Sequence, residues 1–117
     1  MISRKMMTNL EIYNKANSLL STFENIENIS LPVKVHFYFQ KNMETLVNMA
    51  RELEQQRINI LNRLKDKDME EKNKSITDLF SLEQEVKYYT FPIEWLENIE
   101  LTAKQVQAFS FMIEEEE

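Results

Sequence analysis

Apolar residues recur every three or four positions through the middle of this chain. The pattern starts at Val35 and continues to Leu64. This spacing places its members on one face of a helix, so the stretch 32–66 is predicted to form one continuous helix, roughly 50 Å long at the α-helical rise. The positions of this seam are Val35, Phe39, Met43, Leu46, Ala50, Leu53, Arg57, Ile60 and Leu64, and Arg57 is the one charged residue among them.

A shorter amphipathic stretch precedes the long helix. Thr8 or Asn9 is expected to cap it, with Glu11 in its first turn, and the helix is predicted over 9–24. Its apolar positions are Leu10, Tyr13, Ala16, Leu20 and Phe23, flanked by Ile12 and Leu19.

The connection 25–31 is short, which favours an antiparallel hairpin of the two helices over 9–66. The long helix outruns its neighbour, and its C-terminal half is expected to be free for another contact. Residues 1–7 fit no period and are expected to be a frayed lead-in, with Met7 as an alternative natural start.

The C-terminal part of the chain is predicted to be a mixed cap over 76–113. A polar linker over 67–75, either a loop or a solvated continuation of the long helix, leads into it, and a short helical stripe follows over 76–82. Residues 85–91 are rich in aromatic and β-branched side chains and predict a strand that ends at Pro92. A helical turn over 93–99 and a last helix capped by Thr102 complete the cap.

Together these elements predict a mostly α protein with a minor β element, folded as a single domain over 1–117. Its architecture would be an antiparallel helical hairpin with one long helix, followed by a short strand and small C-terminal helices. The chain would end in an acidic tail over 114–117.

Composition supports this fold class. The chain has no glycine and two prolines among its 117 residues. Tight hairpin turns and phosphate-binding loops depend on glycine, so a many-stranded β protein and the common nucleotide-binding motifs are disfavoured. The absence of cysteine excludes disulfides, zinc–thiolate sites and thiol nucleophiles.

Charge and hydropathy narrow the possible environment. The net charge is −6, and four of the negative charges belong to the tail. Broad nucleic-acid binding through a basic field is therefore not expected. No apolar run has the length of a signal peptide or membrane span, so we expect a cytoplasmic protein that does not contact membrane.

Residues for catalysis or metal binding are sparse. His36 is the only histidine, and no serine lies in a nucleophile motif. The carboxylate pairs lack the pattern of an EF-hand loop. We expect no catalytic residue, no bound metal, no cofactor and no enzymatic activity. The pairs considered are Glu52 with Glu54, Glu83 with Glu85, and Glu97 with Glu100.

Arg57 admits two interpretations, because a guanidinium in an apolar seam needs a partner. It could form a salt bridge with Glu54 or with a neighbouring element. It could instead hold a small anion such as a nucleotide, together with Arg51 and Arg63, if all three face one cleft.

The aromatic C-terminal region also admits two interpretations. Its rings could close the core, or they could form an interface, where tryptophan and tyrosine are favoured. A single strand must also find a partner for its backbone, within its own chain, in a second copy or in a target. The candidate interface residues are Tyr88, Tyr89, Phe91, Trp95, Ile60 and Leu64.

Several short motifs occur in a particular order along residues 10–114. They are Leu31-Pro32-Val33-Lys34, Leu53-Glu54-Gln55-Gln56-Arg57, Phe91-Pro92-Ile93, Leu101-Thr102 and Phe111-Met112-Ile113-Glu114. In this order the chain resembles a loose group of small accessory proteins from phages of low-GC hosts. The resemblance implies a virally encoded, non-enzymatic protein of the kind that antagonises host defence, and it implies no site residues.

The expected function is that of a binding protein that occludes a partner protein, such as a host factor or defence component, and forms homo-oligomers. The first alternative is a homo-oligomeric module that sequesters a small anionic ligand. The second is a virion or assembly component.

Overall fold

The structure is a computed structural model that describes residues 2–26 and 30–114. It confirms a mostly α fold with a small antiparallel sheet. Parts of the expected connection (27–29) and of the acidic tail (115–117) lie outside the described residues. The elements are β1 (Ile2–Thr8), α1 (Asn9–Ile26), α2 (Val33–Arg63), α3 (Met69–Ser81), β2 (Glu83–Tyr89), the 3₁₀ helix η1 (Ile93–Leu96), α4 (Ala103–Phe109) and the 3₁₀ helix η2 (Ser110–Met112).

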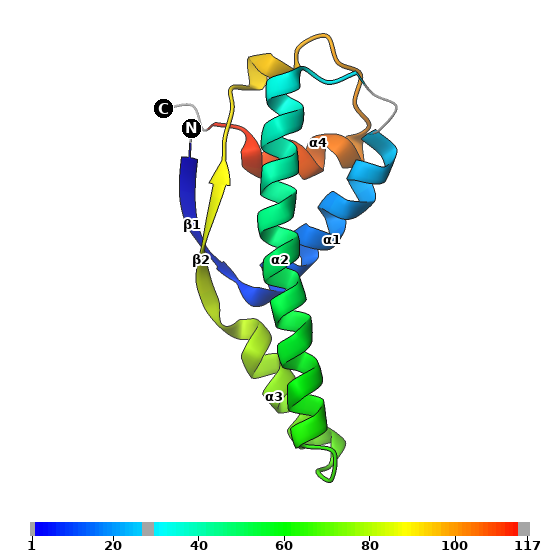
Figure 1. The fold of residues 1–117 in the computed structure, drawn as a ribbon, viewed down its shortest axis with the longest axis vertical. Coiled ribbons are helices and arrows are strands. Elements are labelled where there is room, and N and C mark those ends of the chain that lie inside the picture. The colour runs from blue at the N-terminus through cyan, green and yellow to red at the C-terminus, as the bar shows by residue number, and fades with distance from the viewer. Residues whose placement is uncertain (1, 27–29, 115–117) are drawn as a thin grey trace.

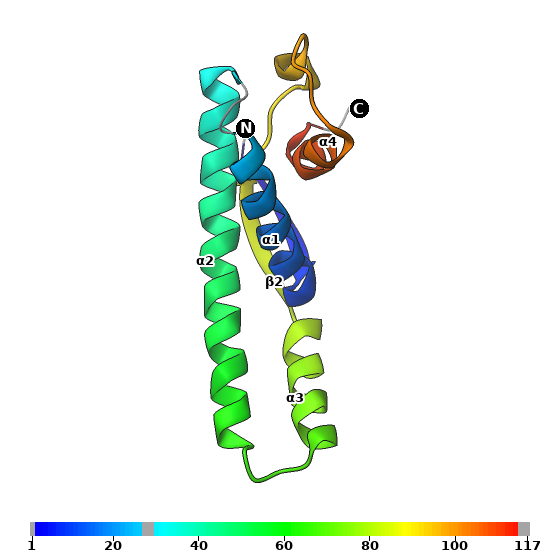
Figure 2. The ribbon, with the colours of Figure 1, turned by 90° about the vertical axis from the view of Figure 1, so that its right-hand side faces the viewer.

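The predicted long helix is α2, and it is continuous over 31 residues. It forms one layer of the molecule, and the other elements pack on one side of it (Figure 2). Its seam lines that side: Val35, Phe39 and Leu46 are fully buried, and Leu53 is 2% exposed. The spacing of apolar residues predicted this buried face, and its burial is the main source of stability of the fold.

The C-terminal half of α2 is not free, contrary to expectation. Helix α3 lies beside it and runs in the opposite direction (Figure 2). Most of the predicted polar linker over 67–75 belongs to this helix. Asp68 caps α3, because its Oδ1 accepts a hydrogen bond from the backbone N–H of Glu71 at 2.9 Å. Leu79, at 9% exposed, packs into the core from α3.

The expectation of a frayed lead-in was also wrong. Residues Ile2–Thr8 form β1, which pairs with β2 in an antiparallel ladder from Ile2 opposite Tyr89 to Thr8 opposite Glu83. The strand predicted over 85–91 is present as β2 but lies two residues earlier, at Glu83–Tyr89, and it finds its partner within its own chain. In Figure 1, the first part of β1 lies on the outer side of β2, away from α2, and the two twisted strands then cross in this view.

Helix α1 crosses α2 as the predicted hairpin (Figure 1). Thr8 caps it: its Oγ1 accepts from the N–H of Glu11 at 3.1 Å, and the Glu11 carboxylate accepts from the N–H of Thr8 at 3.2 Å. The buried face differs from the predicted stripe in part. Ile12, Ala16 and Leu19 are buried, whereas the predicted Leu10 and Leu20 are exposed, because contact with α2 and the sheet selects the face.

The C-terminal cap closes one end of the molecule. After β2, the backbone of Phe91 pairs with the end of the chain: its N–H donates to the carbonyl of Met112 at 2.9 Å, and its carbonyl accepts from the N–H of Glu114 at 3.0 Å. Thr102 caps α4 as predicted, in a capping box with Gln105. Phe91 and Met112 are fully buried.

Candidate functional site

Arg57 forms an ion pair with a residue of its own helix. Its Nη2 lies 2.5 Å from Oε1 of Glu54, and its Nε lies 3.1 Å from Oε2. This two-pronged hydrogen bond lowers the pKa of Glu54 and raises the pKa of Arg57. Of the two interpretations of Arg57, the structure therefore shows the salt bridge with Glu54.

Arg51 and Arg63 do not join Arg57 at one cleft. The three arginines lie on α2 at intervals of six residues. Six residues of an α-helix correspond to a rotation of roughly 240°, so the three side chains leave the helix in three different directions. The anion site predicted from these arginines required a shared face, and this geometry does not provide it.

The aromatic candidates stack on one another inside the chain. Tyr38 of α2 stacks on Tyr89 at 5.0 Å between ring centroids and on Trp95 at 5.8 Å. Trp95 also stacks on Phe91 at 5.8 Å, and Tyr88 meets the ring of Phe111. These rings bind the sheet, α2 and η1 to one another, so most of their surface is used within the fold.

The two aliphatic interface candidates are also partly covered. Ile60 packs against the core from α2, and Leu64 is half-buried at the end of that helix. The opposing α3 accounts for this cover, because it lies beside the C-terminal half of α2.

On the edge of the sheet that belongs to β2, Asn42 of α2, a residue that is 1% exposed, bonds the last residue of the strand. Its Nδ2 donates to the carbonyl of Tyr89 at 2.9 Å, and its Oδ1 accepts from the N–H of Tyr89 at 2.7 Å. The amide side chain thus makes the two hydrogen bonds that a neighbouring strand would make at this position.

The other edge of the sheet belongs to β1, and no further strand of the described residues pairs with it. In an antiparallel pair, residues that exchange backbone hydrogen bonds across the ladder alternate with residues whose N–H and C=O point away. The backbone N–H and C=O of Tyr89 bond to Asn42 and therefore point away from β1. Ile2 is opposite Tyr89 in the register, so the backbone groups of Ile2 point away from β2. Thr8 follows the same alternation, because its N–H donates to the Glu11 carboxylate and not to β2.

A third hydrogen bond fixes the same alternation: Asn9, one residue beyond β1, donates its N–H to the carbonyl of Leu82 at 2.8 Å. Odd-numbered residues of β1 therefore face β2, and even-numbered residues face outward. The N–H and C=O groups of Arg4 and Met6 point to the open edge, and no other described residue bonds to them. This edge is the candidate functional site.

Cationic and apolar side chains surround this edge. Arg4 lies opposite Lys87 of β2, and Lys5 follows on the other face of the strand. Among the described residues, none of these three cations has a carboxylate oxygen within 4.0 Å. Ile2 and Met6 leave 59% and 55% of their surface exposed. The inner face of the sheet is anchored in the core through Met7 and Val86.

The sequence did not predict this site, because β1 was not recognised. One signal could have found it. The strand predicted over 85–91 needed an extended partner, and residues 1–7 were the one stretch not assigned to a helix, strand or loop.

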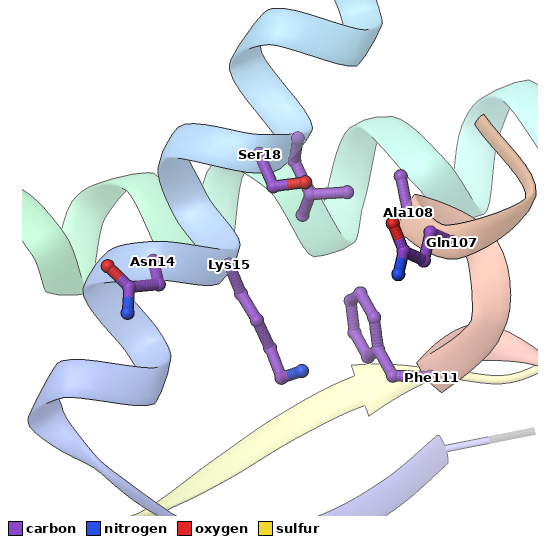
Figure 3. Close-up of a pocket in the computed structure, with 7 residues that line it drawn as sticks. Asn14, Lys15, Ser18, Gln107, Ala108 and Phe111 are labelled. Atoms are coloured by element: carbon purple, nitrogen blue, oxygen red, sulfur yellow. The ribbon is translucent and has the colours of Figure 1, made fainter. Parts of the chain in front are cut away.

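A shallow hollow of about 190 Å³ lies between α1 and α4 (Figure 3). Lys15 and Ser18 point into it from α1, and Gln107 enters from α4. The Lys15 ammonium lies 5.3 Å from the centre of the Phe111 ring. The hollow offers one cation and several hydrogen-bond donors over an apolar floor.

Residues for metal chemistry do not converge in the described part of the chain: no three His, Cys, Asp or Glu side chains come close enough to hold an ion. His36 lies exposed in the first turn of α2. Within residues 2–26 and 30–114, no helix combines the length and apolar content needed to cross a membrane.

Comparisons with protein-family models, with curated proteins and with solved structures find no match to this chain.

Proposed function

We propose that this chain is a non-catalytic binding protein that holds a partner protein at the open edge of β1. The observation that carries the proposal is the outward direction of the N–H and C=O groups of Arg4 and Met6. An exposed strand edge binds an extended segment of another protein by adding it to the sheet, with main-chain hydrogen bonds supplying affinity.

The packing of the sheet against the core supports the proposal. Met7 and Val86 fix the sheet to the core, and Asn42 ties β2 to α2. A preorganised edge loses little conformational entropy when it binds, so more of the interaction energy remains as affinity.

The resemblance to phage accessory proteins suggests which partner is held. A host factor, or a component of host defence, would be occluded when its extended segment is taken into the sheet. Such capture needs no catalytic group and no cofactor.

The test compares capture by matched baits. Met6→Pro removes an outward N–H, and proline is tolerated at such edge positions, so the fold is expected to survive. Met6→Thr keeps the N–H and removes the apolar side chain. Melting curves first verify that both variants fold. We expect proteins retained by the wild-type and Met6→Thr baits, but lost with Met6→Pro, in a quantitative mass-spectrometric comparison. An identical set of proteins on all three baits contradicts the proposal.

The hollow at Lys15 favours a second candidate function, the binding of a small anionic ligand. Its ammonium, with Ser18 and Gln107 nearby, supplies donors for a phosphate or carboxylate. A panel of nucleotides should then raise the melting temperature of the wild type and not of Lys15→Gln. Equal shifts in both proteins, or none in either, contradict this candidate.

A further inference from the structure

We propose that the segment held at β1 is acidic, with two adjacent carboxylate side chains between apolar residues. This inference rests on the proposed function and names the chemistry of the partner. It follows from the side chains that an added strand would meet.

The positive side chains along the β1 edge favour a negatively charged partner segment. Arg4 and Lys5 lie side by side along β1, one on each face of the sheet, and Lys87 stands opposite Arg4. Among the described residues, no carboxylate oxygen lies within 4.0 Å of these cations, although Glu85 stands opposite Met6 on the face of Arg4 and Lys87 and the chain as a whole carries a net charge of −6. An acidic residue opposite each of Arg4 and Lys5 would supply the missing counter-charges, and opposite-charge pairs across strands are stabilising.

The exposed apolar residues set the flanks of the segment. Ile2, Arg4 and Met6 share one face of β1, because side chains alternate along a strand. An antiparallel partner strand would meet residues 6 to 2 of β1 in that order along its own sequence. Its residues would therefore be apolar, acidic, acidic, polar and apolar. Its two apolar side chains would cover the exposed Met6 and Ile2.

A second copy of this chain fits the edge less well. The outward residues of both copies must face each other, which limits the antiparallel registers of β1 with itself. One of these places Arg4 opposite Arg4, and the next places Lys5 opposite Lys5. Like charges directly opposite are destabilising. A further shift pairs Arg4 with Thr8, whose N–H is already bonded to Glu11.

The experiment measures binding of a fluorescein-labelled peptide containing Val-Glu-Glu-Thr-Val to the full chain by anisotropy. A control peptide carries Lys-Lys in place of Glu-Glu. We expect the acidic peptide to bind about tenfold more tightly, from two cross-strand charge pairs. The double variant Arg4→Glu, Lys5→Glu should reverse this preference, and Met6→Pro should abolish binding of both peptides.

Three results would overturn the inference. They are equal binding of the two peptides, no saturable binding of the acidic peptide, and a dimer in light scattering that Met6→Pro converts to a monomer. The last result would identify the occupant as a second copy. Charged residues also protect strand edges from aggregation, and protection alone predicts no saturable binding of either peptide.

The capture experiment separates this inference from the proposed function. Capture that is lost with Met6→Pro but kept with Arg4→Glu, Lys5→Glu supports strand addition and rejects acidic recognition. Capture that is unaffected by Met6→Pro rejects both.

Discussion

Replacing Asn42 by alanine should destabilise the protein strongly for a single change on a helix. The side chain is 1% exposed and makes two hydrogen bonds, of 2.9 and 2.7 Å, to the backbone of Tyr89. Alanine would leave a buried donor and a buried acceptor unpaired, and each such group costs about 1–3 kcal/mol. We expect a loss of about 2–4 kcal/mol in the free energy of unfolding.

A matched control isolates this effect. Asn48 lies six residues further along α2 and is exposed. Both alanine variants gain the same helix propensity, roughly 0.5 kcal/mol. The difference between Asn42→Ala and Asn48→Ala therefore reports the buried hydrogen bonds together with the small volume lost beside them.

Urea unfolding followed by circular dichroism gives the free energies, and thermal melting gives an independent measure. The melting temperature of Asn42→Ala should fall roughly 10 °C below that of Asn48→Ala, from the size scaling of unfolding entropy. A difference below about 0.5 kcal/mol, less than one net hydrogen bond is worth, would refute the role of Asn42 in bonding the backbone of β2 at Tyr89.

Three further predictions concern the ion pair, the last helix and the core. Arg57 lowers the pKa of Glu54, so the pair stabilises the fold above the ordinary pKa of 4.5 and loses this effect as the pH falls through the lower, folded-state pKa. Arg57→Ala should raise the Glu54 pKa toward 4.5 in an NMR titration, and an unchanged pKa would disprove the assignment. Thr102→Ala should cost about 1 kcal/mol in urea unfolding, and Thr102→Ser should cost much less, because serine can still cap α4; equal losses would argue against the cap. Phe91→Ala should cost about 3–5 kcal/mol and shift the emission of Trp95, its stacking partner, to longer wavelength; unchanged emission would contradict the stacking.

The long helix could be predicted because its information is local. An apolar residue every three or four positions specifies a helix whatever the remainder of the chain does. The caps at Thr8 and Thr102 were equally local, since each depends on residues within one turn.

Strand β1 was not predictable in the same way. Its adjacent Arg4 and Lys5 and its adjacent Met6 and Met7 hide the alternation of a half-buried strand. Its conformation depends on β2, which lies more than seventy residues away in the sequence. Pairing at that distance is decided by tertiary contacts and not by propensity.

Helix α3 was predicted only in its second half, as the helical stripe that follows residue 75. Its first half is almost entirely polar and lacks the apolar spacing that predicts a helix, although Asp68 followed by Glu71 three residues later is a helix-start pattern. Asn42 shows a related limit. A polar residue on a helix gives no sign in the sequence that it faces the edge of a strand.

The central claim is that the backbone of β1 alternates between groups bonded to β2 and groups open to a partner. Residue-resolved amide hydrogen exchange in the isolated chain tests it most directly. The amides of Lys5 and Met7 should exchange slowly, and those of Arg4 and Met6 should exchange fast. Equal protection of all four amides would contradict the claim, because the edge would then already be paired.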